Sequence, residues 1–236
     1  LQKYGYRVAV VPQPNWRDDL RDFRKLGAPR LYFGVNSGAM DSMVNHYTAA
    51  KRLRSDDAYT PEGKAGQRPD YAVTVYTKIL KEIYPEVPVI IGGIEASLRR
   101  VTHYDYWQNS LKPSILVESG ADWLCYGMGE RTMLEFTKAI EAGRNVNDIR
   151  KIPQLGFYMD GRCRTKDAVI LNSYERCTKD KVAFAENFHV VETYANMMHP
   201  PVLVEPVGNG YVQINPTWPP ATQQEMDSFW DLPFTK

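Results

Sequence analysis

Short apolar runs alternate with amphipathic segments over the first 143 residues. The runs are bounded by Gly or Pro and have the length of buried strands, which we expect over residues 6–11, 31–35, 87–91 and 123–126. Between them, apolar positions recur at helical spacing. We expect helices over residues 16–26, 71–84 and 130–142, with a last helical turn before Gly5 and another before Gly120. Strands that alternate with helices are joined by right-handed crossovers, so the pattern predicts an α/β fold with a doubly wound, mostly parallel sheet.

The pattern changes after Gly143, where turn signals and shorter apolar runs predominate. We expect one hairpin over residues 157–159 and 163–165, a clearer one over residues 202–205 and 211–214, a helix over residues 181–196, and an extended arm at Pro216, Pro219 and Pro220. This segment predicts a small α+β appendage packed on the sheet domain.

Three segments follow from these patterns. Residues 1–143 are expected to form the doubly wound domain, residues 144–220 the appendage, and residues 221–236 a linker. The chain opens on the last turn of a helix, and Leu1 is not an initiator methionine. We therefore expect the sheet domain to lack its first strand and the chain to be a fragment of a longer protein.

Composition limits the classes of protein that fit. The chain has 236 residues, of which 43% are hydrophobic, and a net charge of +1, which predicts no general attraction to nucleic acid or to anionic membranes. It has no apolar stretch of about 18 residues, so we expect a soluble protein without a membrane span. Three cysteines, an odd number, fit a reducing compartment better than a disulfide scaffold, and we expect a cytoplasmic location.

Polar and aromatic residues gather immediately after the apolar run that ends at Ile91. Gly92-Gly93 breaks the run where the carboxyl end of a parallel strand is expected, and ligands bind at that edge in open α/β sheets. The candidate catalytic residues are Glu95, Arg99, Arg100, His103 and Asp105, with Tyr104, Tyr106 and Trp107 as a stacking wall. The alternative is structural, because the same charges can form ion pairs with one another and the aromatic residues can pack in the core.

Two other loops follow predicted strands and carry glycines. Together with Gly92-Gly93 they supply the candidate cofactor-binding residues, which are Ser37, Gly38, Gly92, Gly93, Gly127, Gly129 and Glu130. Backbone amides at a helix start can hold an anion, although Glu130 would repel one. Glycines at such turns also serve geometry alone. No dinucleotide or P-loop motif is present, so the loops do not identify a nucleotide.

The connection between residues 37 and 68 is long for a structureless loop. A helix is expected over residues 43–53, followed by an exposed arm over residues 54–68. The arm is either a lid or docking element, or a plain solvated loop.

No metal ligands are expected. Cys125, Cys163 and Cys177 are separated by 38 and 14 positions in the chain, whereas an iron-sulfur cluster of the kind that leaves one iron open needs three thiolates on one short loop. Cys125 is expected as a small core residue in a strand.

Five motifs in order resemble the amino-terminal region of YgiQ-type radical SAM proteins. The matching segments are residues 5–14, 34–43, 92–100 (Gly-Gly-Ile-Glu-Ala-Ser-Leu-Arg-Arg), 103–107 (His-Tyr-Asp-Tyr-Trp) and 126–130 (Tyr-Gly-Met-Gly-Glu). Residues 229–236 look like the connector into the radical SAM core. The resemblance implies, for the full-length protein, a [4Fe-4S] cluster on a Cys-x3-Cys-x2-Cys motif, S-adenosylmethionine as cofactor, and a substrate that is not assigned. It also implies a strand order similar to that of cobalamin-binding domains.

Three functions remain open at this level. The chain is an accessory, substrate-access domain of a radical SAM enzyme, a corrinoid-binding module that holds cobalamin, or a structural and partner-binding domain without a ligand of its own. In the first case its partner is its own radical SAM core in cis, the substrate being a small molecule or a macromolecule. The cluster motif is absent from these residues, so we expect the fragment alone to bind no cofactor and to be non-catalytic.

Overall fold

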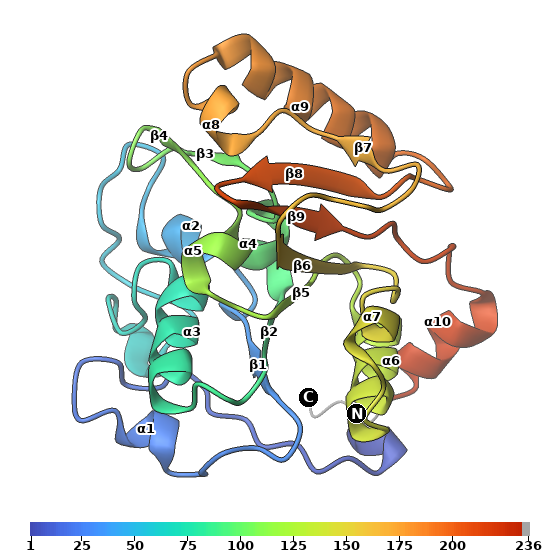
Figure 1. The fold of residues 1–236 in the computed structure, drawn as a ribbon. Coiled ribbons are helices and arrows are strands. Elements are labelled where there is room, and N and C mark those ends of the chain that lie inside the picture. Colours follow the sequence, from blue (N-terminus) through green and yellow to red (C-terminus); the bar gives the residue numbers. More distant parts are fainter. Residues whose placement is uncertain (233–236) are drawn as a thin grey trace.

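The computed structural model describes residues 1–232, in which one seven-stranded sheet runs through the molecule (Figure 1). Its strands, in spatial order, are β1 (Phe33–Val35), β2 (Val89–Ile91), β5 (Trp123–Cys125), β6 (Leu155–Asp160), β9 (Gly210–Ile214), β8 (Leu203–Val207) and β7 (Val169–Ile170). β1, β2 and β5 are parallel, β5, β6, β9 and β8 pair antiparallel, and β7 lies parallel to β8. The α/β class, with helices on both faces of the sheet, is confirmed.

The helices differ widely in length. They are η1 (Gln2–Tyr4), α1 (Arg21–Arg24), α2 (Ser42–His46), η2 (Pro61–Gly63), α3 (Ala72–Ile83), α4 (Gly93–Leu98), α5 (Ile115–Ser119), α6 (Glu130–Glu141), α7 (Val146–Ile149), α8 (Tyr174–Cys177), α9 (Lys181–Ala195) and α10 (Gln223–Trp230). Within residues 1–232, no helix combines the length and apolar composition that crossing a membrane requires.

Both faces of the parallel strands are buried. Val89 and Ile91 pack with α3 and α5, whereas Ile90, between them in sequence, packs with Phe136 of α6 and Ile149 of α7. Successive side chains of a strand point to opposite faces, so the continuous apolar run of β2 places helices on both sides. Figure 1 shows α3 and α5 on one side of the sheet and α6 and α7 on the other.

Residues 144–220 continue the same sheet. β6 is hydrogen-bonded to β5 at Cys125–Leu155, and Leu203 and Val212 belong to the same apolar cluster as Val89. The β8–β9 hairpin and α9 confirm the sequence-based prediction. In the segment expected as a linker, residues 223–230 form α10, and residues 233–236 lie outside the described residues.

Two predicted strands are wrong. Residues 6–11 form no strand, and residues 163–165 do not pair with residues 157–159, because β6 pairs with β9 and β5 instead. A strand requires a backbone partner, and local β-propensity does not supply one.

Two predicted helices are much shorter than expected. The helix over residues 16–26 is reduced to α1, because Asp18 and Asp19 bond the amides of Leu20 and Arg21 and Leu20 is left-handed with φ 60°. The helix over residues 43–53 is α2 alone, since Tyr47 is already extended.

One buried acid joins the two halves of the fold. Glu205 of β8 is 1% exposed, and its carboxylate oxygens lie 2.8 and 3.1 Å from the backbone nitrogen of Thr102, which follows α4. Burial raises the pKa of Glu205 to about 7, from an ordinary value of 4.5. The folded protein therefore binds a proton at Glu205 that the unfolded chain releases above pH 4.5.

Glu205→Gln is expected to stabilise the protein in a pH-dependent way. Ionisation of Glu205 destabilises the folded state progressively between pH 4.5 and 7, by about 3 kcal/mol at pH 8, and Gln lacks this charge. Melting temperatures at pH 5 and pH 8 measure the effect. The variant should exceed the wild type at pH 8 and approach it at pH 5; a constant difference at both values would contradict the raised pKa.

Candidate functional site

Three loops meet at the carboxyl edge of the parallel strands, as the sequence predicts for Gly38, Gly93 and Gly127. Residues 36–41 link β1 to α2, Gly92 links β2 to α4, and residues 126–129 link β5 to α6. The loops are in direct contact, because the amide of Gly127 donates to Ser97 Oγ of α4 at 3.2 Å. Gly38, Gly93 and Gly127 all have positive φ values, which L side chains rarely adopt.

The glycines let the loops pack against each other. A Cβ atom added to Gly92 would lie 3.2 Å from the carbonyl oxygen of Cys125, and one on Gly93 would lie 3.2 Å from Asn36 Cβ. At Gly129 it would meet Cys125 Sγ at 3.0 Å. Protein atoms therefore occupy the space in which a side chain at these glycines would lie. The glycines are required for the close packing of the loops.

Glu95 ties the first two loops together. Its side chain is fully buried, and its oxygens accept the backbone N–H groups of Ser42 at the start of α2 and of Val73 at the start of α3, both at 3.0 Å. Two helix starts thus share one carboxylate, which satisfies amides that have no partner within their own helices.

Asp41 and Arg99 form a buried ion pair beside Glu95. Asp41 caps α2 through the amides of Met43 and Val44, and its other oxygen pairs with Arg99 Nη1. The Arg99 side chain is 8% exposed and that of Asp41 is 4% exposed. Because both charges are desolvated, each depends on the other.

The arm over residues 54–68 is largely exposed, as the sequence predicts, but a second buried ion pair anchors it. Arg68 lies 2.9 Å from Asp57 Oδ2 and donates from Nη1 to the carbonyl oxygen of Ser37 at 2.8 Å. Arg68 is 5% exposed and Asp57 is 2% exposed. The arm therefore folds back and holds the loop after β1. Arginine and aspartate within an otherwise polar segment gave no sequence signal of this contact.

The other candidate catalytic residues lie around the network. Arg100 is half-buried, donates to the carbonyl oxygen of Ser97 at 2.7 Å and lies over the ring of Tyr126. His103 begins strand β3 (His103–Asp105), which pairs with β4 (Ser110–Lys112) in a hairpin absent from the sequence-based prediction. Burial lowers the pKa of His103 to about 4, so its imidazole is neutral at pH 7. Asp105 is 3% exposed and accepts the amide of Gln108 at 2.7 Å, which closes the hairpin.

The remaining cofactor-binding candidates are divided between the core and the surface. Ser37 is 3% exposed, and its hydroxyl donates to the carbonyl oxygen of Met40. Glu130 is exposed at the first position of α6. Gly129 and Glu130 also line a cavity of about 990 Å³ between η1, α6 and α10, which includes Tyr4, Trp218 and Phe229.

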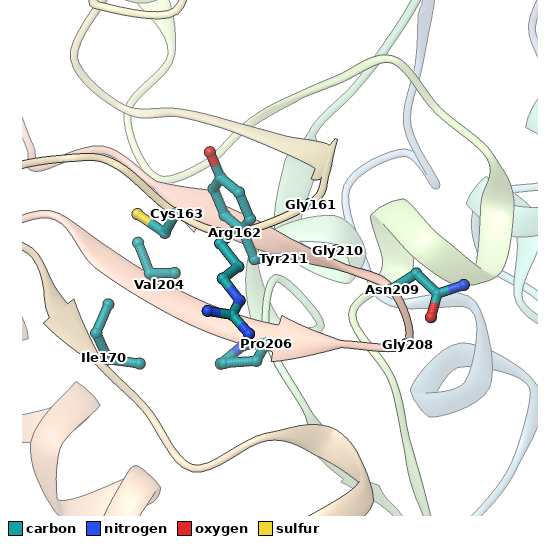
Figure 2. Close-up of a pocket in the computed structure, with 10 residues that line it drawn as sticks. All are labelled: Gly161, Arg162, Cys163, Ile170, Val204, Pro206, Gly208, Asn209, Gly210 and Tyr211. Carbon is teal, nitrogen blue, oxygen red and sulfur yellow. The ribbon is translucent and has the colours of Figure 1, made fainter.

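A second pocket lies away from the loop edge, on the antiparallel half of the sheet. It has a volume of about 610 Å³ and is formed by residues 161–163 together with β7, β8 and β9. Figure 2 shows Arg162, Cys163 and Tyr211 gathered over the β8–β9 hairpin. None of the residues that the sequence singles out as catalytic lines it.

Apolar side chains at the loop edge are exposed, in contrast to the charges beneath them. Ile94 is 48% exposed and Leu98 is 61% exposed, and they share a face of α4 at i and i+4 spacing. Met128, in the loop after β5, is 59% exposed. Sequence reasoning passed over these residues, although large apolar side chains inside glycine-rich loops are a usable signal of a contact surface.

The three cysteines do not fit an iron-sulfur cluster. They lie on β5, in the loop after β6 and in α8, and within residues 1–232 no group of three His, Cys, Asp or Glu side chains is placed to hold a metal ion. Burial raises the pKa of the Cys125 thiol to about 11 and also raises that of Cys177, which disfavours the thiolate form that binds iron.

Fold and site together define a doubly wound α/β domain whose loop edge is closed by an internal polar network. A family model described as "Radical SAM N-terminal" matches residues 1–236. The chain belongs to the radical SAM N-terminal family, as its motifs indicate.

Relatives named "UPF0313 protein" match the whole chain. The one from Porphyromonas gingivalis is 51% identical over 239 residues, the one from Bacteroides thetaiotaomicron 49% over 253 residues, and one from Clostridium botulinum 42% over 236 residues. All of this chain is covered in each case, but only 38%, 40% and 36% of those proteins. The chain thus spans about two fifths of the relatives' length. No solved structure matches it.

Adjacent arginines provide a test of the network. Arg99→Ala leaves the Asp41 carboxylate buried without its partner and is expected to destabilise the fold by about 3 to 5 kcal/mol. Arg100→Ala removes one hydrogen bond and one cation–π contact, with an expected loss of about 1 kcal/mol. Thermal denaturation measures both, and equal losses would show that the Asp41–Arg99 pair does not support the fold.

The cysteines are tested in the full-length protein. A variant that combines Cys125→Ala, Cys163→Ala and Cys177→Ala should keep the iron content of the wild type after anaerobic reconstitution. Circular dichroism controls for folding. Loss of iron from a folded triple variant would assign cluster ligation to this domain.

Proposed function

We propose that this chain is the accessory domain of a radical SAM enzyme, and that its loop edge docks on the cluster-bearing core of the same protein and forms one wall of the substrate-access path. One observation carries the proposal. At the edge where open α/β sheets place ligands, Asp41 and Arg99 are buried as an ion pair, and the buried carboxylate of Glu95 is held by two backbone amides. The apolar side chains of Ile94, Leu98 and Met128 are exposed beside them.

The exposed apolar surface favours contact with protein rather than polar chemistry. Glu95 has both oxygens engaged by backbone amides, and Arg99 is paired with Asp41. Neither is free to transfer a proton or to hold a polar substrate. Apolar side chains on rigid loops, in contrast, lose unfavourable contact with water when another surface covers them.

The length of the relatives supports a partner within the same protein. This chain spans about two fifths of their length, so a larger part of such a protein is available to cover the loop edge. The family implies a [4Fe-4S] cluster and S-adenosylmethionine for the full-length protein. The cysteines here do not fit the cluster, so its ligands belong to the other part.

The test compares two leucines of similar exposure in the full-length protein. Leu98→Asp should weaken the docked interface, and iron should then leave the reconstituted cluster several times faster when an external chelator is added. Leu26 is 59% exposed and lies in the connection between α1 and β1, outside the three loops of the carboxyl edge, so Leu26→Asp is the control. Initial iron content should be unchanged in both. Identical rates of iron loss for the two variants would refute docking through this edge.

A further inference from the structure

The outer edge of β1 is open. β1 lies at the end of the sheet and pairs with β2 alone. The amide of Phe33 donates to the carbonyl oxygen of Pro88 at 2.9 Å, and the carbonyl oxygen of Val35 accepts from Gly92 at 3.0 Å. Since backbone groups alternate in direction along a parallel strand, the N–H and C=O of Gly34 point away from β2. Gly34 is exposed, and a Cβ atom added to it would meet nothing within 4 Å.

Residues 6–11, Tyr-Arg-Val-Ala-Val-Val, have the composition of a strand but no partner. Val8 is 42% exposed and Val10 is 79% exposed. Within residues 1–232, the amides and carbonyls of residues 7–11 form no backbone hydrogen bond. An apolar, β-prone run with both its side chains and its backbone in water is unfavourable unless another segment covers it.

The run passes around the open edge of β1. Tyr6 is held on one face of the sheet, where its hydroxyl donates to Glu141 of α6 at 2.7 Å. Trp16 is held on the other face, where it packs against the cluster of α3 and donates to the carbonyl oxygen of Gln67. The chain between them must cross at the end of the sheet, as Figure 1 shows for the blue segment that runs toward α1.

We propose that a β-strand from the part of the full-length protein outside residues 1–236 lies between β1 and residues 6–11 and pairs with both. The incoming strand satisfies the outward N–H and C=O of Gly34 on one side and, on the other, the backbone groups of alternate residues in the run of residues 7–11. It also covers Val8 and Val10. The sheet then gains two strands at this edge, and β1 becomes an internal strand.

The occupant is a segment of the same protein because the relatives are about two and a half times as long as this chain. A second copy of the chain is the alternative occupant. β1 offers only three residues to such a contact, which is short for a stable intermolecular pairing.

Hydrogen exchange on the full-length protein tests the pairing. The matched control is Ile170 of β7, at the opposite edge of the same sheet, because the amides of Val169 and Leu171 bond to β8 and that of Ile170 therefore points outward as well. The amide of Gly34 should exchange at least 100-fold more slowly than that of Ile170, and so should one alternate set of amides in residues 7–11, either those of Val8 and Val10 or those of Arg7, Ala9 and Val11. Exchange of Gly34 as fast as that of Ile170 would overturn the proposal.

Concentration identifies the occupant. Protection that is unchanged across a 100-fold dilution supports a strand from the same molecule, and protection lost on dilution would assign the edge to a second copy.

A disulfide experiment tests the alternative that residues 6–11 pair directly with β1. A disulfide between Val10→Cys and Gly34→Cys would bring the two backbones into contact, leave no room for a strand, and overturn the proposal.

Two exposed valines supply an independent measurement on the full-length protein. Val10→Asp should lower the melting temperature by several degrees, because the added charge then lies against the side chains of the incoming strand and loses contact with water. Val182 of α9 is 65% exposed and is the control, since Val182→Asp places the charge in water. Equal melting temperatures for the two variants would show that Val10 stays exposed in the full-length protein, against the proposal.

Discussion

The parallel half of this domain depends on one buried carboxylate. Glu95 reaches from α4 to the first amides of α2 and α3, so the loops that leave β1 and β2 are fixed relative to each other by the same side chain. The ion pair between Asp41 and Arg99 lies next to it and adds a second link between α2 and α4. Without the Glu95 carboxylate, the amides of Ser42 and Val73 would be buried without a hydrogen-bond acceptor.

This constraint gives the buried charged residues at the loop edge a structural role instead of a ligand-binding one. In many α/β proteins, carboxylates and guanidinium groups at this position face a ligand. Here the side chains of Asp41, Glu95 and Arg99 hold the loops together. The large apolar side chains exposed at the same edge are those of Ile94, Leu98 and Met128. Under the function proposed above, a domain built this way contributes shape and cover to a reaction, while the reactive groups come from the part of the protein that binds the cluster.

The sequence predicted those elements whose signal is local. β2 and β5 are continuous apolar runs, and α3, α6 and α9 have helical spacing, so each was found from its own residues. The convergence of Gly38, Gly93 and Gly127 followed from the geometry of parallel strands. The interactions of Glu95 were not predictable, because its partners lie 53 and 22 positions away and are backbone amides, which carry no residue signature. The strand expected over residues 6–11 failed for the related reason that pairing is not a property of one segment.

The open edge of β1 also affects the solubility of a fragment that ends at these residues. An unpaired strand edge beside an exposed valine-rich run is the arrangement from which chains template one another into intermolecular β-structure. A fragment limited to residues 1–236 therefore exposes a site at which aggregation starts. Colloidal stability, rather than chemistry, then decides where such a protein is best divided.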